Sequence, residues 1–141
     1  MTETTRSDQF QVWLMEMDAA LERFIASAPS AVAQRLDLSA ESLDSIEAWI
    51  LSKYGAPEEL RPVSEGAFHD GAARYIGEVF RTHTASKWSL DLSDPKNLNY
   101  GVPALTGGKL TIGLCPLTLV TALLDRRTGK YLSTILRNVT G

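Results

Sequence analysis

The sequence has few of the residues on which metal centres and disulfides depend. Of its 141 residues, one is cysteine and two are histidine. The single thiol, Cys115, excludes an intramolecular disulfide and a multi-cysteine zinc site. His69 and His83 are fourteen positions apart, roughly 21 Å on a helix, so the two rings cannot bind one metal ion. We therefore expect no metal site.

Long apolar runs and phosphate-binding motifs are lacking as well. The most apolar stretch, residues 110–124, is too short to span a bilayer and contains Gly113 and Pro116. The polar beginning of the chain lacks the apolar core of a signal peptide, and together with the single cysteine this indicates a cytoplasmic protein. Gly107-Gly108-Lys109 is followed by Leu110 instead of the Ser or Thr of a phosphate-binding loop. We expect no cofactor and no membrane contact.

Charge is distributed unevenly along the chain. Residues 1–60 carry 11 acidic and 4 basic side chains, a net charge of −7, whereas residues 61–141 carry 6 acidic and 10 basic side chains, a net charge of +4. The overall charge of −3 and the pI of about 5.4 disfavour a nucleic-acid binder. The asymmetry indicates either a surface for a protein partner or two halves that pack against each other.

Apolar residues at spacings of three and four predict three helices in the first 84 residues. The first covers residues 8–26, the second 39–55 and the third 64–84. Gly71 and Gly77 lie inside the third helix, where each costs about 1 kcal/mol relative to alanine. A helix tolerates glycine most readily where another backbone approaches closely, so we expect the third helix to lie against a sheet.

Strand signals follow the third helix. Residues 87–92 alternate polar and apolar side chains, which predicts a strand. Residues 98–105 and 109–114 are predicted to form two further strands. The turn between the last two contains two glycines, which supply positive φ. Ile112 shares one face of the last strand with its neighbours two positions away. The sequence therefore predicts a small antiparallel sheet of about three strands.

The remaining residues are helical, and the whole chain fits the α+β class. Residues 116–139 form either one kinked helix or two helices that separate near Gly129. The predicted order is N-terminal helices, a sheet packed by a central helix, and C-terminal helices. We expect one domain over residues 1–141, with a helical part at 1–60 and a helix-sheet-helix part at 61–141.

Candidate functional residues are few. Glu78 and Arg81 are three positions apart on the third helix and can pair. Glu78 is then either a general base or, as we favour, part of a tether between helix and sheet, because no second acid, histidine or metal ligand accompanies it. Cys115 precedes a predicted helix, as a reactive thiol would, but its leucine neighbours favour a core position. The remaining candidate binding residues are basic: Arg126, Arg127 and Lys130.

One segment resembles a known pattern. Tyr75-Ile76-Gly77-Glu78-Val79-Phe80-Arg81, followed by a strand bearing Trp88, resembles small bacterial domains of unknown function. Some of these resemble immunity proteins, which neutralise toxins exchanged between competing bacteria. The likeness covers about residues 65–135, although Ala85-Ser86-Lys87 departs from the small residues expected before the tryptophan.

The resemblance implies protein binding and a bacterial source, and it supplies no catalytic residues. We therefore expect a non-catalytic domain that binds another protein, as an immunity-like or accessory protein. The alternative is a small-molecule-binding protein or enzyme that uses Glu78 and Arg81, or Cys115.

Overall fold

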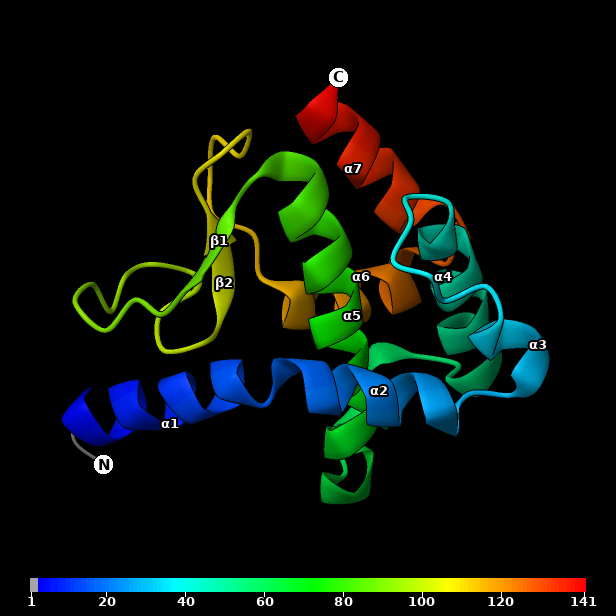
Figure 1. Ribbon diagram of the computed structural model, residues 1–141, viewed down its shortest axis with the longest axis horizontal. Coiled ribbons are helices and arrows are strands. Elements are labelled where there is room, and N and C mark those ends of the chain that lie inside the picture. Colours follow the sequence, from blue (N-terminus) through cyan, green and yellow to red (C-terminus); the bar gives the residue numbers. More distant parts are fainter. Residues whose placement is uncertain (1–2) are drawn as a thin grey trace.

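The computed structural model describes residues 3–141, most of which are helical (Figure 1). A single sheet of two antiparallel strands accompanies seven α-helices in this range, as the α+β class requires. None of these helices is long and apolar enough to cross a membrane. In chain order the elements are α1 (Glu3–Met15), α2 (Met17–Ser27), α3 (Ser30–Ala33), α4 (Ser42–Lys53), the 3-10 helices η1 (Pro57–Leu60) and η2 (Val63–Glu65), α5 (Gly66–Thr84), β1 (Lys87–Ser89), β2 (Ala104–Thr106), α6 (Pro116–Arg126) and α7 (Tyr131–Thr140).

Helices α1 and α2 replace the single helix expected over residues 8–26. The helix begins earlier, at Glu3, and is interrupted at Glu16, where φ is −87° and ψ is 1°. Backbone hydrogen bonds continue past the interruption, from Glu16 N–H to Val12 and from Ala20 N–H to Glu16. The two helices therefore form one nearly continuous rod along the lower edge of Figure 1.

Helix α5 occupies the centre of the fold and contacts α2, α6 and the sheet. A Cβ atom at Gly77 would overlap the ring of Trp88 on β1, so this glycine does bring the helix against the sheet. At Gly71 the expectation was wrong, because a Cβ atom there would overlap the ring of Phe24 on α2. The two glycines thus accept one aromatic ring each, from different sides of α5.

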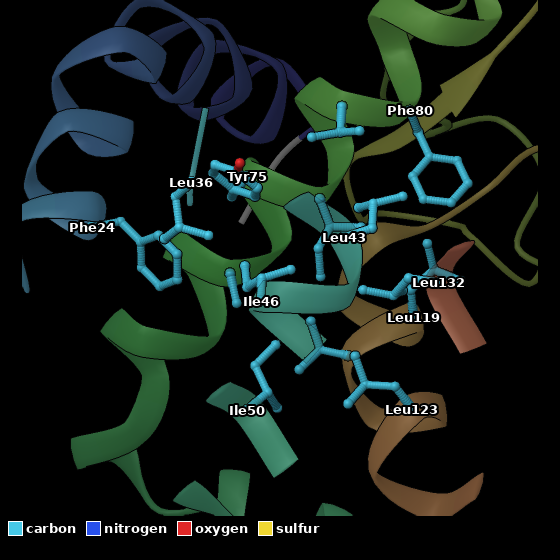
Figure 2. Close-up of a cluster of buried hydrophobic side chains, with 14 of the residues drawn as sticks. Phe24, Leu36, Leu43, Ile46, Ile50, Tyr75, Phe80, Leu119, Leu123 and Leu132 are labelled. Atoms are coloured by element: carbon cyan, nitrogen blue, oxygen red, sulfur yellow. The ribbon is translucent and has the colours of Figure 1, made fainter. Parts of the chain in front are cut away.

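The core lies where α4, α5, α6 and α7 meet (Figure 2). Helices from both sequence halves contribute to it, so the halves share one core. Tyr75 adds a polar contact inside this core: its hydroxyl donates to Ser42 Oγ over 2.7 Å and accepts the N–H of Leu38 over 2.8 Å. The large side chains labelled in Figure 2 are Phe24, Leu36, Leu43, Ile46, Ile50, Tyr75, Phe80, Leu119, Leu123 and Leu132.

The sheet has two strands, not about three. Strand β1 pairs with β2 in antiparallel register, with Trp88 opposite Leu105. The expected strand at 109–114 is reduced to one bridge, in which Leu105 and Leu114 exchange hydrogen bonds of 2.7 and 2.9 Å. Ile112, predicted to share one face of this strand with Leu110 and Leu114, is 80% exposed, whereas those two leucines are partly buried against the core. The strand fails because the N–H of Lys109 binds the carbonyl of Thr84 at the end of α5, which draws the chain away from the sheet.

The segment 116–139 forms two helices, which decides between the two alternatives. Arg127 and Gly129 both have positive φ, 52° and 80°, and the chain turns there between α6 and α7. The N-terminus of α7 is capped by Glu47, a fully buried residue of α4. The Glu47 carboxylate accepts hydrogen bonds from the N–H groups of Tyr131 and Leu132 over 3.0 and 2.8 Å. A carboxylate at a helix N-terminus satisfies unpaired N–H groups and complements the helix dipole.

Candidate functional site

Glu78 and Arg81 form the ion pair that their spacing predicts. Arg81 donates through Nε and Nη2 to the Glu78 carboxylate over 2.8 and 3.0 Å. The indole N–H of Trp88 donates to the same carboxylate over 2.7 Å. Burial of the Glu78 carboxyl favours its neutral form, but the hydrogen bonds from Arg81 and Trp88 outweigh burial and hold its pKa below the ordinary value.

This geometry agrees with the tether that we favoured for Glu78. The carboxylate joins α5 to β1 through Trp88, and its two oxygens are both engaged. The Glu78 side chain is 12% exposed and that of Arg81 is 40% exposed, so the guanidinium is the more accessible partner. A general base would need a lone pair directed at a substrate, whereas this carboxylate is already occupied by donors from the chain itself.

A second polar cluster, which sequence reasoning missed, fastens α1 to α5. Asp70 accepts the indole N–H of Trp13 over 2.8 Å and Nε of Arg74 over 2.7 Å. The Arg74 guanidinium lies 4.2 Å from the centroid of the Trp13 ring and also donates to the Trp13 carbonyl. Arg74 is only 4% exposed, so this cation is neutralised by a carboxylate, a carbonyl and a ring face. The i,i+4 spacing of Asp70 and Arg74 was the one available signal.

The three basic candidates do not converge on one site. Arg127 donates to the carbonyls of Tyr54, Gly55 and Leu51, each over 3.1 Å, and so closes the C-terminal end of α4. Lys130 pairs with Asp44 over 2.7 Å. Arg126 is exposed and has no ion pair within the described part of the chain. The structure therefore assigns Arg127 a structural contact and leaves Lys130 and Arg126 at the surface.

Cys115 and the histidines lie apart from these clusters. Cys115 is the N-cap residue of α6 and is 6% exposed, as expected of a core cysteine. His69 hydrogen-bonds through Nε2 to the Leu117 carbonyl over 3.0 Å, and His83 through Nδ1 to the Val79 carbonyl over 2.8 Å. Between residues 3 and 141, no group of three or more His, Cys, Asp or Glu side chains is arranged to hold a metal ion.

The solvent side of α1 and α2 carries an apolar strip with an acidic border. Val12 is 52% exposed and Met15 is 84% exposed. Ala19 continues the strip at helical spacing, and it too is exposed. Four exposed carboxylates each lie three or four residues from a member of the strip, and so on the same side of the helices: Asp8, Glu16, Asp18 and Glu22. We call this surface the α1–α2 face.

A cleft of about 600 Å³ opens at the other end of the molecule. It lies between the N-terminal end of α4, the C-terminal end of α5, the turn that follows β2, and α7. Of the candidate binding residues only Lys130 lines it, together with Arg137, the most distant member of the same basic concentration in the sequence, and Lys109 from the Gly-Gly-Lys turn. The convergence of Lys109 with the other two cations could not be foreseen, because they come from separate parts of the chain.

No protein-family model, curated protein or solved structure matches this chain. The likeness to immunity-like bacterial domains therefore remains a hypothesis that rests on residues 65–135. Function has to be inferred from the surfaces and contacts described above.

Proposed function

We propose that this chain is a non-catalytic domain that binds a basic protein through the α1–α2 face. The observation that carries the proposal is the exposure of Val12 and Met15 on one helix face, side by side with carboxylates. Apolar area at the centre of a patch supplies affinity, and a charged border supplies specificity and a fast association rate. The immunity-like role implied by the resemblance is the more specific form of the same proposal.

The sign of the charge selects the partner. Asp8, Glu16, Asp18 and Glu22 are exposed on this face, and the described basic side chains of the two helices are Arg6 and Arg23. Arg23 is exposed and follows Ala19 of the strip by four residues, so the face carries four acids and one cation. Arg6 lies over the Tyr100 ring, 5.3 Å from its centroid, on the side of α1 that faces the body of the protein. A negative surface with exposed apolar residues fits a positively charged, partly apolar surface on another protein.

The enzyme alternative receives less support from the same contacts. It would use Glu78 with Arg81, or Cys115. The Glu78 carboxylate is occupied by Arg81 and Trp88, and Cys115 is 6% exposed in the core. A protein-binding role does not require Glu78, Arg81 or Cys115 to contact a substrate, so it is compatible with the contacts that they make within the fold.

A charge-reversal experiment tests the proposal. The tagged protein is used to isolate its partner from the native host, and both are then purified and their affinity measured by calorimetry at low and high salt. We expect Asp18→Lys with Glu22→Lys to weaken binding at least tenfold, because it places cations opposite a basic surface. The control, Asp125→Lys with Glu58→Lys, changes the charge equally at exposed positions outside the α1–α2 face.

Two results would overturn the proposal. One is a partner that binds the α1–α2 variant and the control with equal affinity. The other is a partner of acidic surface, whose affinity would rise with the reversed charges. If the partner is toxic when expressed alone and harmless when co-expressed with this chain, the immunity-like form is supported.

A further inference from the structure

The cleft at the end of α5 brings together three cations from two parts of the chain. Lys109 follows the turn after β2, Lys130 immediately precedes α7, and Arg137 lies on α7, two turns further along. The acidic part of the lining consists of Glu41, which precedes α4, and Asp44, which lies on α4. In Figure 1 this end of the molecule is at the top, whereas α1 and α2 run along the bottom.

Lys109 is placed by backbone contacts. Its N–H donates to the carbonyl of Thr84 over 2.8 Å, which docks the turn onto the end of α5. Gly108 precedes it with φ of 60°, and a Cβ atom there would overlap the Thr84 carbonyl oxygen. This close approach requires glycine and fixes the position from which Lys109 reaches the cleft.

The position of α7 is fixed as well. Glu47 caps its first turn through the N–H groups of Tyr131 and Leu132. Lys130, immediately before that turn, pairs with Asp44, and this hydrogen bond holds the pKa of the Asp44 carboxyl below its ordinary value. One lysine and one carboxylate of the cleft thus neutralise each other.

Apart from the Lys130–Asp44 pair, the charged lining of the cleft consists of two cations, Lys109 and Arg137, and one acid. Neither Lys109 nor Arg137 has an ion pair among the described residues. The Arg137 guanidinium makes a 3.4 Å contact with Thr134, and its charge also helps to lower the pKa of Asp44. Glu41 is the remaining acid of the lining. Lysine provides a compact positive charge and arginine a planar pair of donors, the combination that suits an oxyanion. Ala40, which is partly exposed, adds apolar surface for the rest of a ligand.

We propose that this cleft binds a small molecule through a phosphate or carboxylate group, which lies between Lys109 and Arg137. The site is separate from the α1–α2 face, so the proposal does not depend on the proposed protein partner. Phosphate and carboxylate share the same donor requirements, and the choice of probe distinguishes them.

Titration with inorganic pyrophosphate and with citrate tests the site. Amide NMR spectra of the ¹⁵N-labelled protein are recorded at constant ionic strength, with sodium chloride as the reference salt. We expect saturable shifts for Lys109, Ser133 and Arg137 with at least one of the two anions, and the anion bound more tightly identifies the class. Lys109→Ala and Arg137→Ala should each weaken binding about tenfold, the effect of losing about 1.4 kcal/mol.

The matched control is Arg126→Ala, which removes the same charge from an exposed position that does not line the cleft. Its affinity should stay within twofold of the unchanged protein. Shifts that fail to saturate with both anions would overturn the proposal, as would equal weakening in the control. Because the readout is the spectrum of the protein itself, a loss of folding in any variant is visible separately from a loss of binding.

Discussion

The indole N–H of Trp88 and the guanidinium of Arg81 converge on one oxygen, Oε2 of Glu78, at 2.7 and 2.8 Å. This oxygen joins the strand β1 to the helix α5. The Trp88 ring also lies edge-on to Trp13, with centroids 4.9 Å apart. One aromatic residue thus contacts the sheet, the central helix and α1 together.

Removing the Trp88 ring should therefore destabilise the fold strongly. We expect Trp88→Ala to lower the free energy of unfolding by about 2–4 kcal/mol, because the packing of a partly buried ring and its hydrogen bond are both lost. Trp88→Phe keeps much of the ring and removes the N–H, so its cost should be smaller, about 1–3 kcal/mol. Urea unfolding followed by circular dichroism measures both. Equal costs for the two variants would mean that packing of the ring contributes little.

Two glycines of α5 should respond to alanine in opposite ways. Gly77→Ala would place a Cβ atom in the Trp88 ring, and we expect a cost of about 1–3 kcal/mol. Gly66 has nothing within 4 Å of its Cβ position, so Gly66→Ala should be neutral or stabilise the fold by up to about 1 kcal/mol. Thermal unfolding of both variants checks the difference. A stabilised Gly77→Ala variant would place the helix further from the sheet than described.

Stability should depend on pH through Glu78. Its folded-state pKa lies below the ordinary value of 4.5, so the folded state stabilises the ionised form. This contribution is present above about pH 4.5 and is lost as the pH falls through the folded-state pKa. We expect Glu78→Gln to flatten the decline in unfolding free energy between about pH 5 and pH 3. Glu58→Gln, at an exposed residue of η1, should leave the decline unchanged.

Arg127 contributes through its side chain and is strained in its backbone. Arg127→Ala should cost about 1–2 kcal/mol, because three carbonyls at the end of α4 lose their donors. Arg127→Gly loses the same donors but relieves the positive φ of 52°, so it should be more stable than the alanine variant by about 1 kcal/mol. Chemical unfolding of the pair separates the two effects. An alanine variant as stable as the glycine variant would contradict the strain.

Local sequence signals were sufficient for α4, for α5 and for the Glu78–Arg81 pair, but they did not show the interruption at Glu16. The periodicity of residues 64–84 comes close to the bounds of α5, and a spacing of three is enough to predict an ion pair on a helix. The two consecutive glycines also predicted the turn at Gly107 and Gly108, and both residues do have positive φ. These features depend on neighbours within a few positions.

What the sequence could not supply were the long-range partners. The alternation at 109–114 favours a strand, but a strand needs a neighbour, and the backbone of Lys109 is bound to α5 instead. Arg74 and Glu47 look like surface residues in sequence, yet both are buried. Their partners, Trp13 for one and the first turn of α7 for the other, lie 61 and 85 positions away. The cleft depends on the same kind of convergence.

The cap that Glu47 forms on α7 has a consequence for the time at which the protein can fold. At a synthesis rate of about 5–20 residues per second, the ribosome reaches Leu132 about 4–17 seconds after Glu47. During that interval no N–H groups of α7 are present to donate to the carboxylate, and an ionised group without partners is costly to bury. We therefore expect α4 to reach its final packing only after α7 has been synthesised.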